Sequence, residues 1–223
     1  MCGGGGQLKS PPQHTKSQSD YPQSICDIGC SNGDFLFYLS DVFPHAKLYG
    51  IDILPSLLEK TRQDFKAHNK PCPTLWEGDI QSGLNLPKER FDMVFLNGVI
   101  GIFDDLHKPL EHFANLINPK GVGYIWGCFN PYPIDVFIKG RVCGSSHLES
   151  GWNLHSKQSV LEICDGLGLK GVFYDDFDIG IDLPQSEDYL RTWTFRLEGG
   201  KRAIINGLSL VHNFSLLELT YRI

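Results

Sequence analysis

The stretch that most constrains the fold runs from Ser24 to Phe35 and reads S-I-C-D-I-G-C-S-N-G-D-F. Its first five residues are mostly apolar and lead into Gly29, which predicts a short buried strand of a parallel sheet. Phe35, Leu36 and Leu39 then recur at helical spacing. A strand, a glycine turn and a helix in direct succession place free backbone N–H groups and a helix N-terminus at the carboxyl edge of the sheet, where a ligand can approach closely.

The spacing of the glycines separates two kinds of nucleotide-binding turn. A dinucleotide fingerprint G-x-G-x-x-G that begins at Gly29 needs glycine at positions 31 and 34, where this chain has Ser31 and Asp34. A nicotinamide-dependent dehydrogenase is therefore disfavoured. The segment D-I-G-C-S-N-G instead resembles the first motif of class I S-adenosylmethionine (SAM)-dependent methyltransferases, [DE]-x-G-x-G-x-G. The match holds at Asp27, Gly29 and Gly33 and departs at Ser31, which is small enough for the turn.

The tips of the following strands agree with this resemblance. Asp52 ends the second expected strand, 23 positions after Gly29, close to the ~20-residue gap that separates a glycine turn from a ribose-binding acid. Asp52 could instead cap the next helix, and Asp79, after the third strand, could be a plain turn residue. The resemblance implies ribose binding for Asp52 and adenine binding for Asp79. The cofactor-binding residues that it implies are Asp27, Gly29, Cys30, Ser31, Asn32, Gly33, Asp52, Ile53, Asp79, Ile80, Asn97 and Gly98.

Alternating strand and helix patterns predict an α/β fold with an extra C-terminal β-hairpin. The resemblance implies a doubly wound, mostly parallel, seven-stranded sheet with helices on both faces and an antiparallel last strand. We expect one SAM-dependent methyltransferase domain over residues 21–223, after a disordered tail over residues 1–20 that is rich in Gly, Pro, Ser and Gln. The expected strands are 24–28, 47–51, 74–77, 91–96, 122–128, 173–179 and 217–223. The expected helices are 34–42, a second that begins at Pro55, 104–116 and 157–167, and the expected hairpin is 190–206.

Residues 129–156 are too long for a plain loop and have poor periodicity, so we expect a substrate lid there. Aromatic and ionisable residues are concentrated in this insertion. If the methyl acceptor is an alcohol, the reaction needs a general base, and His155, His147 and Asp135 are the candidates. A carboxylate acceptor would need none of them.

Composition limits the partners. The net charge of −6 and the lack of a basic block argue against binding to nucleic acid. Seven cysteines without a C-x-x-C or a cysteine–histidine pairing indicate buried thiols in a reducing compartment and predict no metal site. No apolar run approaches the ~18 residues of a membrane span, and the polar N-terminus is unlike a signal peptide. We therefore expect a cytoplasmic protein.

The resemblance implies transfer of a methyl group from SAM to a small-molecule acceptor, with a hydroxyl of a sugar or secondary metabolite as one option. Two alternatives stay open: a nucleic-acid or protein methyltransferase, and a SAM-binding scaffold domain without catalysis. The 190–206 hairpin could either cover the site or form a contact in a homodimer.

Overall fold

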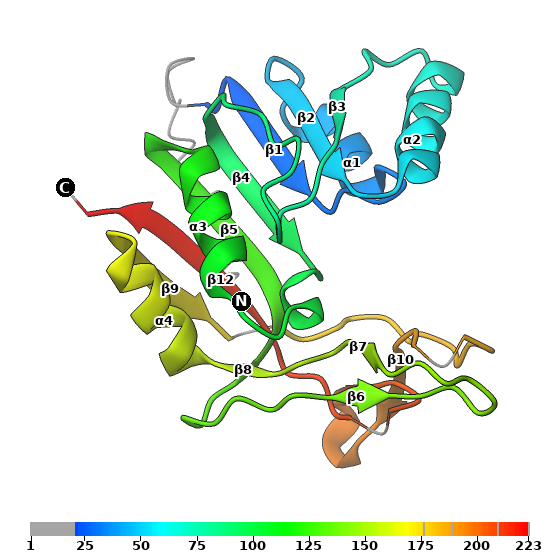
Figure 1. Cartoon of the computed structure of the whole chain (residues 1–223). Helices are drawn as coiled ribbons and strands as arrows, with labels where there is room; N and C mark the ends of the chain where they lie inside the picture. The colour runs from blue at the N-terminus through cyan, green and yellow to red at the C-terminus, as the bar shows by residue number, and fades with distance from the viewer. Residues whose placement is uncertain (1–20, 176, 189, 209, 223) are drawn as a thin grey trace, which may run out of the picture.

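The computed structural model describes residues 21–175, 177–188, 190–208 and 210–222. Its centre is a sheet with the strand order β3-β2-β1-β4-β5-β12-β9, and β8 pairs with the end of β5 (Figure 1). These strands are β1 (Ser24–Ile28), β2 (Lys47–Asp52), β3 (Thr74–Glu77), β4 (Phe91–Asn97), β5 (Ile117–Asn130), β8 (His155–Ser156), β9 (Leu169–Tyr174) and β12 (Phe214–Tyr221). The expected tail 1–20 lies outside the described residues.

The direction of the strands confirms the predicted fold class. Strands β1 to β5 pair in parallel, whereas β12 is antiparallel to both of its neighbours, β5 and β9. The chain runs outward from β1 to β3 and then returns to the other side of β1 with β4. The order therefore reverses between β1 and β4, and in open α/β sheets ligands bind at the carboxyl ends of the strands at such a switch point.

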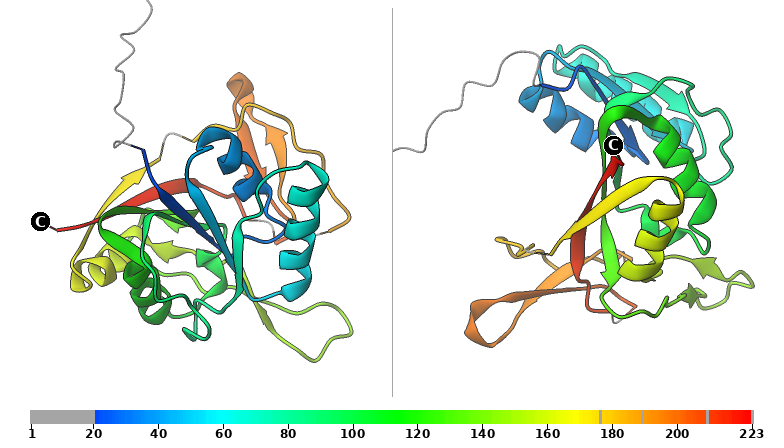
Figure 2. Two further views of the ribbon diagram at one scale, coloured as in Figure 1. Left: turned by 90° about the horizontal axis from the view of Figure 1, so that it is seen from above. Right: turned by 90° about the vertical axis from the view of Figure 1, so that its left-hand side faces the viewer.

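Helices cover both faces of the sheet, and adjacent residues of one strand show this. A Cβ at Gly50 would contact Leu36 of α1 (Asp34–Val42). The next residue, Ile51, belongs to the buried cluster formed with α3 (His107–Leu116) and α4 (Lys157–Gly166). Successive strand residues point to opposite faces, so α1 lies opposite α3 and α4. In the right-hand view of Figure 2, α3 and α4 lie together on one side of the sheet.

The ends of the helices follow from local sequence. Helix α2 (Pro55–Ala67) has proline in its first turn, where the missing N–H is no loss. Helix α4 starts after Ser156, whose side chain accepts a hydrogen bond from the Ser159 N–H. Helix α1 follows Gly33, which has a left-handed backbone with φ of 80°. Among the described residues, no helix is long and apolar enough to cross a membrane.

Several expected boundaries were wrong, among them the start of β12, which is Phe214 rather than residue 217. Helix α3 starts at His107 rather than residue 104, because the Asp105 carboxylate accepts the His107 N–H in a turn that precedes it. Strand β5 starts at Ile117 rather than residue 122, because the chain stays extended beside β4 through a register shift. Strand β9 covers 169–174 rather than 173–179, since Gly168, with φ of 77°, turns the chain directly from α4 into the sheet.

The C-terminal hairpin is present as expected. Strands β10 (Trp193–Arg196) and β11 (Arg202–Ile205) pair in antiparallel register, and the 3-10 turn η3 (Glu198–Gly200) joins them. The predicted insertion contains two short strands, β6 (Lys139–Gly140) and β7 (Glu149–Ser150), which pair with each other. Its role as a substrate lid stays a prediction, as does the assignment of one domain to residues 21–223.

Candidate functional site

The glycine turn after β1 is held in a shape that its sequence requires. Gly29 has φ of 70°, and its N–H donates to the Ile51 carbonyl at 2.7 Å. A Cβ at Gly29 would lie 2.5 Å from a Val99 methyl group, and one at Gly33 would lie 2.4 Å from the Thr61 methyl group. Only glycine fits both the left-handed backbone and the space at these two positions.

Asp52, at the tip of β2, ties this turn to the second strand. Its carboxylate accepts the Ser31 N–H at 2.8 Å and the Leu54 N–H at 2.9 Å. The Leu54 contact lies at the start of helix α2 and matches the capping role that the sequence left open for Asp52. The Ser31 contact links Asp52 to the glycine turn. Asp52 is only 8% exposed. Two backbone N–H groups use part of the hydrogen-bonding capacity of a carboxylate, which has about four acceptor sites.

Asp27 lies one strand away, inside β1. It is 3% exposed, and burial raises the pKa of its carboxyl group to about 8. The Asn97 amide, at the end of β4, donates to Asp27 Oδ1 at 3.4 Å. Gly98 follows with φ of 71°, and a Cβ there would meet open space. The structure thus brings Asp27, Asn97 and Gly98 to the same switch point as the glycine turn.

Asp79 and Ile80 are placed differently. The Asp79 carboxylate accepts the Gln81 N–H at 2.8 Å and the Ser82 hydroxyl at 2.6 Å. The pKa of Asp79 is lowered overall: burial raises it, but these hydrogen bonds outweigh that effect. Asp79 therefore stabilises its own turn, as the alternative from the sequence allowed, and Ile80 packs into the core. Ile53, by contrast, is 60% exposed beside Asp52. Cys30 is buried, whereas Ser31 is exposed and Asn32 half-buried.

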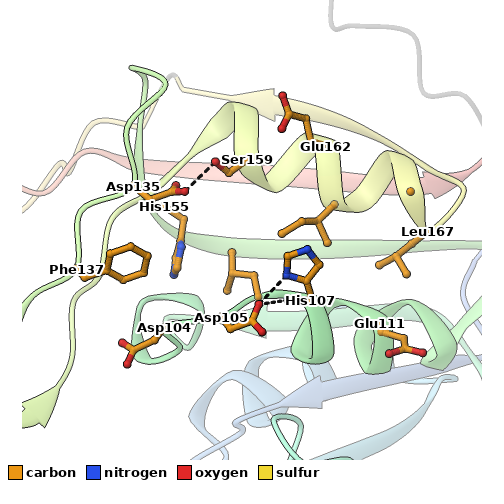
Figure 3. A pocket seen from close by; sticks show the side chains of 13 residues that line it. Asp104, Asp105, His107, Glu111, Asp135, Phe137, His155, Ser159, Glu162 and Leu167 are labelled. Atoms are coloured by element: carbon orange, nitrogen blue, oxygen red, sulfur yellow. Dashed lines mark hydrogen bonds and ion pairs between the residues drawn. The ribbon is translucent and has the colours of Figure 1, made fainter.

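The three candidate bases are not brought together. His155 and Asp135 line a cavity of about 780 Å³ between α3 and α4, whose lining includes none of the predicted cofactor residues (Figure 3). His155 is buried, and its Nε2 donates to the Phe103 carbonyl at 2.9 Å. Asp135 accepts the Ser156 N–H at 2.5 Å and the Ser159 hydroxyl at 2.9 Å, and hydrogen bonding holds its pKa low despite burial. His147 is exposed elsewhere in the insertion.

A buried histidine near the carboxyl edge, His212, was missed from the sequence. Its ring packs 5.1 Å from that of Trp152 and 6.0 Å from that of Phe214. The available signal was its position just before an alternating final strand. Histidine at a strand end is common in protein cores, so the sequence did not distinguish it.

No group of three or more His, Cys, Asp or Glu side chains is placed to hold a metal ion in the described parts of the chain. The six cysteines there are free thiols. The carboxyl edge of the sheet therefore has the arrangement of a nucleotide-binding site, formed by the glycine turn, Asp52, Asp27 and Asn97.

Comparison with known proteins gives an independent result. A family model described as a methyltransferase domain matches residues 26–122, a segment that begins inside β1 and ends in the first part of β5. Trans-aconitate 2-methyltransferase from Escherichia coli is 28% identical over 98 residues, which are 44% of this chain and 36% of the relative. The match thus spans about a third of the length of that relative.

Solved structures agree in fold. YcgJ protein from Bacillus subtilis aligns over 90% of this chain and 92% of its own, with a TM-score of 0.61 and 13% identity. The O-methyltransferase of a polyketide synthase multienzyme from Brevibacillus brevis, in complex with S-adenosyl-L-homocysteine, aligns over 70% of this chain and 50% of its own, with a TM-score of 0.56 and 15% identity. At these identities the likeness concerns the fold.

The matched segment holds the same strand–glycine turn–helix unit and the same strand-tip acid from which the resemblance was drawn. The overall fold agrees with these structural neighbours. Residues 26–122 therefore resemble a methyltransferase domain, and the chain shares the fold of these structural neighbours.

Proposed function

We propose that this protein binds SAM at the switch point and transfers its methyl group to a small-molecule acceptor. The observation that carries the proposal is the contact between Asp52 and the Ser31 N–H. It joins the tip of β2 to the glycine turn after β1, so that a carboxylate and a turn built for close approach face one ligand. The match of residues 26–122 to a methyltransferase domain supports it.

The residues present fit this ligand. Asp52 keeps acceptor capacity for ribose hydroxyls after its two backbone contacts. The exposed side chain of Ile53 offers an apolar surface beside it, and the open space at Gly98 leaves room near the tip of β4. Asp79 and Ile80 fit less well, because one is committed to its turn and the other to the core. When bound, SAM supplies a methyl group already activated by a positively charged sulfur.

The work left to the chain is alignment and exclusion of water. Correct orientation of two reacting groups can supply roughly 7–11 kcal/mol of a reaction barrier. The turn is suited to this task because Val99 and Thr61 pack tightly against its glycines. Asp27 adds a buried carboxyl group at the same place, whose raised pKa makes it sensitive to a nearby cation.

For the acceptor we propose a small molecule, such as a sugar or secondary metabolite with a hydroxyl group. The net charge of −6 disfavours a polyanionic substrate. The Brevibacillus neighbour is described as an O-methyltransferase, which supports an oxygen acceptor by analogy. His155, His147 and Asp135 stay predictions as bases, and the hydrogen bonds of His155 and Asp135 support positioning roles for both.

The test measures cofactor affinity directly by calorimetry, with S-adenosylhomocysteine as the probe. Asp52→Ala is expected to weaken binding tenfold or more, because a charge-assisted hydrogen bond contributes about 1.5–3 kcal/mol. Glu89→Gln is the matched control: Glu89 is an exposed carboxylate that precedes β4, at the opposite edge of the sheet. The measurement is made on folded protein, as checked by circular dichroism.

An unchanged affinity in Asp52→Ala would remove the ribose assignment. Lack of binding in the wild type would remove the proposed function as a whole. Acceptors are then sought with isotope-labelled SAM against phenols, carboxylic acids and amines, with mass spectrometry to detect methylated products. Binding without transfer to any class would favour the scaffold alternative.

A further inference from the structure

Two buried polar atoms lack a hydrogen-bond partner within the described residues: Nδ2 of Asn206 and Nε2 of His212. Asn206 is 1% exposed and His212 is 4% exposed. Native proteins leave few buried polar atoms unpaired, and those that remain often mark a bound molecule or a catalytic role. Both residues lie next to the antiparallel bridge between residues 205 and 211, so one bound group can pair with both atoms.

The backbone of this ribbon places the two side chains near each other. The His212 N–H donates to the Ile204 carbonyl at 2.8 Å, and residues 205 and 211 form an antiparallel bridge. Positions 204 and 212 are therefore opposite, and Asn206 is the diagonal neighbour of His212. Diagonal neighbours in an antiparallel pair lie roughly 7–8 Å apart and point to the same face. One small group between them can contact both side chains.

The chemistry of the two atoms is complementary to a hydroxyl group. Asn206 Oδ1 already accepts the Leu208 N–H at 3.0 Å, so the free Nδ2 is a donor. His212 Nδ1 lies 3.5 Å from Cys128 Sγ. With the ring proton on Nδ1 and directed at this sulfur, Nε2 keeps its lone pair and is an acceptor. A hydroxyl group donates one hydrogen bond and accepts others, and so pairs with both atoms at once.

The ionisation of the surroundings agrees with this arrangement. Burial lowers the pKa of His212, which keeps the ring neutral and able to take a proton at neutral pH. Burial raises the pKa of Cys128 to about 12, so the thiol stays protonated. Two cations line a cavity together with His212: Lys157, which is paired with Asp175, and Arg202, which is paired with Asp182. Among these neighbours, His212 is thus the neutral group that can act as a base.

A series of contacts connects His212 with the candidate cofactor turn along the carboxyl edge of the sheet. Val99 packs against Gly29, and two residues later the Gly101 carbonyl accepts the Asn153 N–H at 2.8 Å. The ring of the adjacent Trp152 packs at a tilted angle against that of His212, and Trp152 has a left-handed backbone with φ of 66°. A bulky residue in this conformation is strained, and such residues cluster at ligand sites.

A cavity of about 410 Å³ is lined by His212 and the rings of Phe129, Phe177 and Phe214; its lining reaches Ile204 but does not include Asn206. Its volume is within the usual range for small-molecule sites, roughly 300–1,000 Å³. The aromatic rings suit a ring-sized molecule, and the charged side chains of Lys157, Asp175 and Arg202 line the rest of the cavity. The cavity is distinct from the one that contains His155 and Asp135.

We propose that the methyl acceptor is an aromatic or similarly apolar hydroxyl compound, held by Asn206 Nδ2 and deprotonated by His212 Nε2. This inference rests on the proposed methyl transfer. The acceptor O–H bond breaks as Nε2 takes the proton, and the oxygen lone pair forms the new O–CH₃ bond. The electrons of the broken S–CH₃ bond stay on sulfur, which leaves as a neutral thioether. His212 then returns its proton to solvent.

The experiment compares two phenols at about pH 8. Under these conditions 4-methoxyphenol keeps its proton, since an ordinary phenol has a pKa of about 10, whereas 4-nitrophenol is largely ionised. His212→Gln is expected to slow methylation of 4-methoxyphenol by about 10²–10⁴-fold, the usual contribution of a general base. The same variant should slow methylation of 4-nitrophenol less than about tenfold, because that phenol needs no base.

A second variant tests the donor. Asn206→Asp keeps the acceptor for the Leu208 N–H but replaces the Nδ2 donor with an oxygen. It is expected to weaken binding of 4-nitrophenolate to protein saturated with S-adenosylhomocysteine by tenfold or more, as followed by the absorbance of the phenolate. His45→Gln, at an exposed position before β2, is the control and should match the wild type in both assays.

The outcomes separate this inference from the proposed function. Calorimetric affinity for S-adenosylhomocysteine should be unchanged in all three variants; its absence in the wild type would refute the proposed function. Equal slowing of both phenols by His212→Gln, or no slowing, would show that the unpaired atoms only hold structural water. Methylation of carboxylic acids by a preparation that neither binds nor methylates the phenols would also overturn the proposal.

Discussion

At the scale of single residues, Asp27 has the most unusual environment in the site. It sits inside a buried strand, and the cause of its raised pKa is loss of water, which the Asn97 amide only partly offsets. A carboxyl group with an ordinary value of 3.8 in the unfolded chain and about 8 in the folded protein binds its proton more tightly after folding. Stability is therefore linked to pH through this one residue.

The linkage has a defined sign. The stabilising effect of the bound proton is complete below about pH 4 and is lost as the pH rises through about 8. Within that window the free energy of unfolding should fall by up to about 1.4 kcal/mol per pH unit because of Asp27. Asp27→Asn should remove this component, so the difference between variant and wild type should grow with pH. Urea unfolding at a series of pH values measures it, and parallel pH profiles would contradict the assignment.

At the scale of elements, two glycine-to-alanine substitutions test how tightly the strand–turn–helix unit is packed, because the two glycines differ in the space around them. Gly33 and Gly98 both have positive φ, 80° and 71°. A Cβ at Gly33 would lie 2.4 Å from the Thr61 side chain, whereas one at Gly98 meets nothing within 4 Å. Gly98→Ala should cost about 1–2 kcal/mol, the penalty for a left-handed alanine. Gly33→Ala should cost about 1–3 kcal/mol more, from overpacking. Denaturant unfolding of both variants gives the comparison, and equal losses would be inconsistent with the packing at Thr61.

The same unit shows what the sequence could predict. The glycines, Asp52 and the apolar strands were predictable, because a fixed local pattern forces each one: positive φ, a strand tip or burial on both faces. Two roles were predicted for Asp79, adenine binding or a turn residue; its carboxylate accepts the Gln81 N–H and the Ser82 hydroxyl within its own turn, and adenine binding stays a prediction. His212 was not predicted, because its surroundings come from Trp152 and Cys128, which are distant along the chain. Contacts of this kind leave no periodic pattern in a sequence.

At the scale of the whole molecule, the candidate cofactor site lies at the middle of one continuous sheet rather than on a detachable loop. Strand β1 pairs with β2 on one side and β4 on the other, and β5 and β12 extend the same sheet. A ligand that binds across the tips of β1 and β2 is therefore coupled to unfolding of the sheet as a unit. Binding to the folded state alone stabilises it by about 2.7 kcal/mol when the ligand is at a hundred times its Kd.

For a chain of this size each kcal/mol raises the melting temperature by roughly 2–4 °C. Saturating S-adenosylhomocysteine should therefore raise Tm by about 5–10 °C, as measured by scanning calorimetry. NADH at the same concentration should leave Tm unchanged, because Ser31 and Asp34 replace the glycines that a dinucleotide turn requires. Asp52→Ala should reduce the S-adenosylhomocysteine shift, whereas Glu89→Gln should retain it. A larger Tm shift with NADH than with S-adenosylhomocysteine would instead assign the switch point to a dinucleotide, because both compounds are expected to bind at the same strand tips.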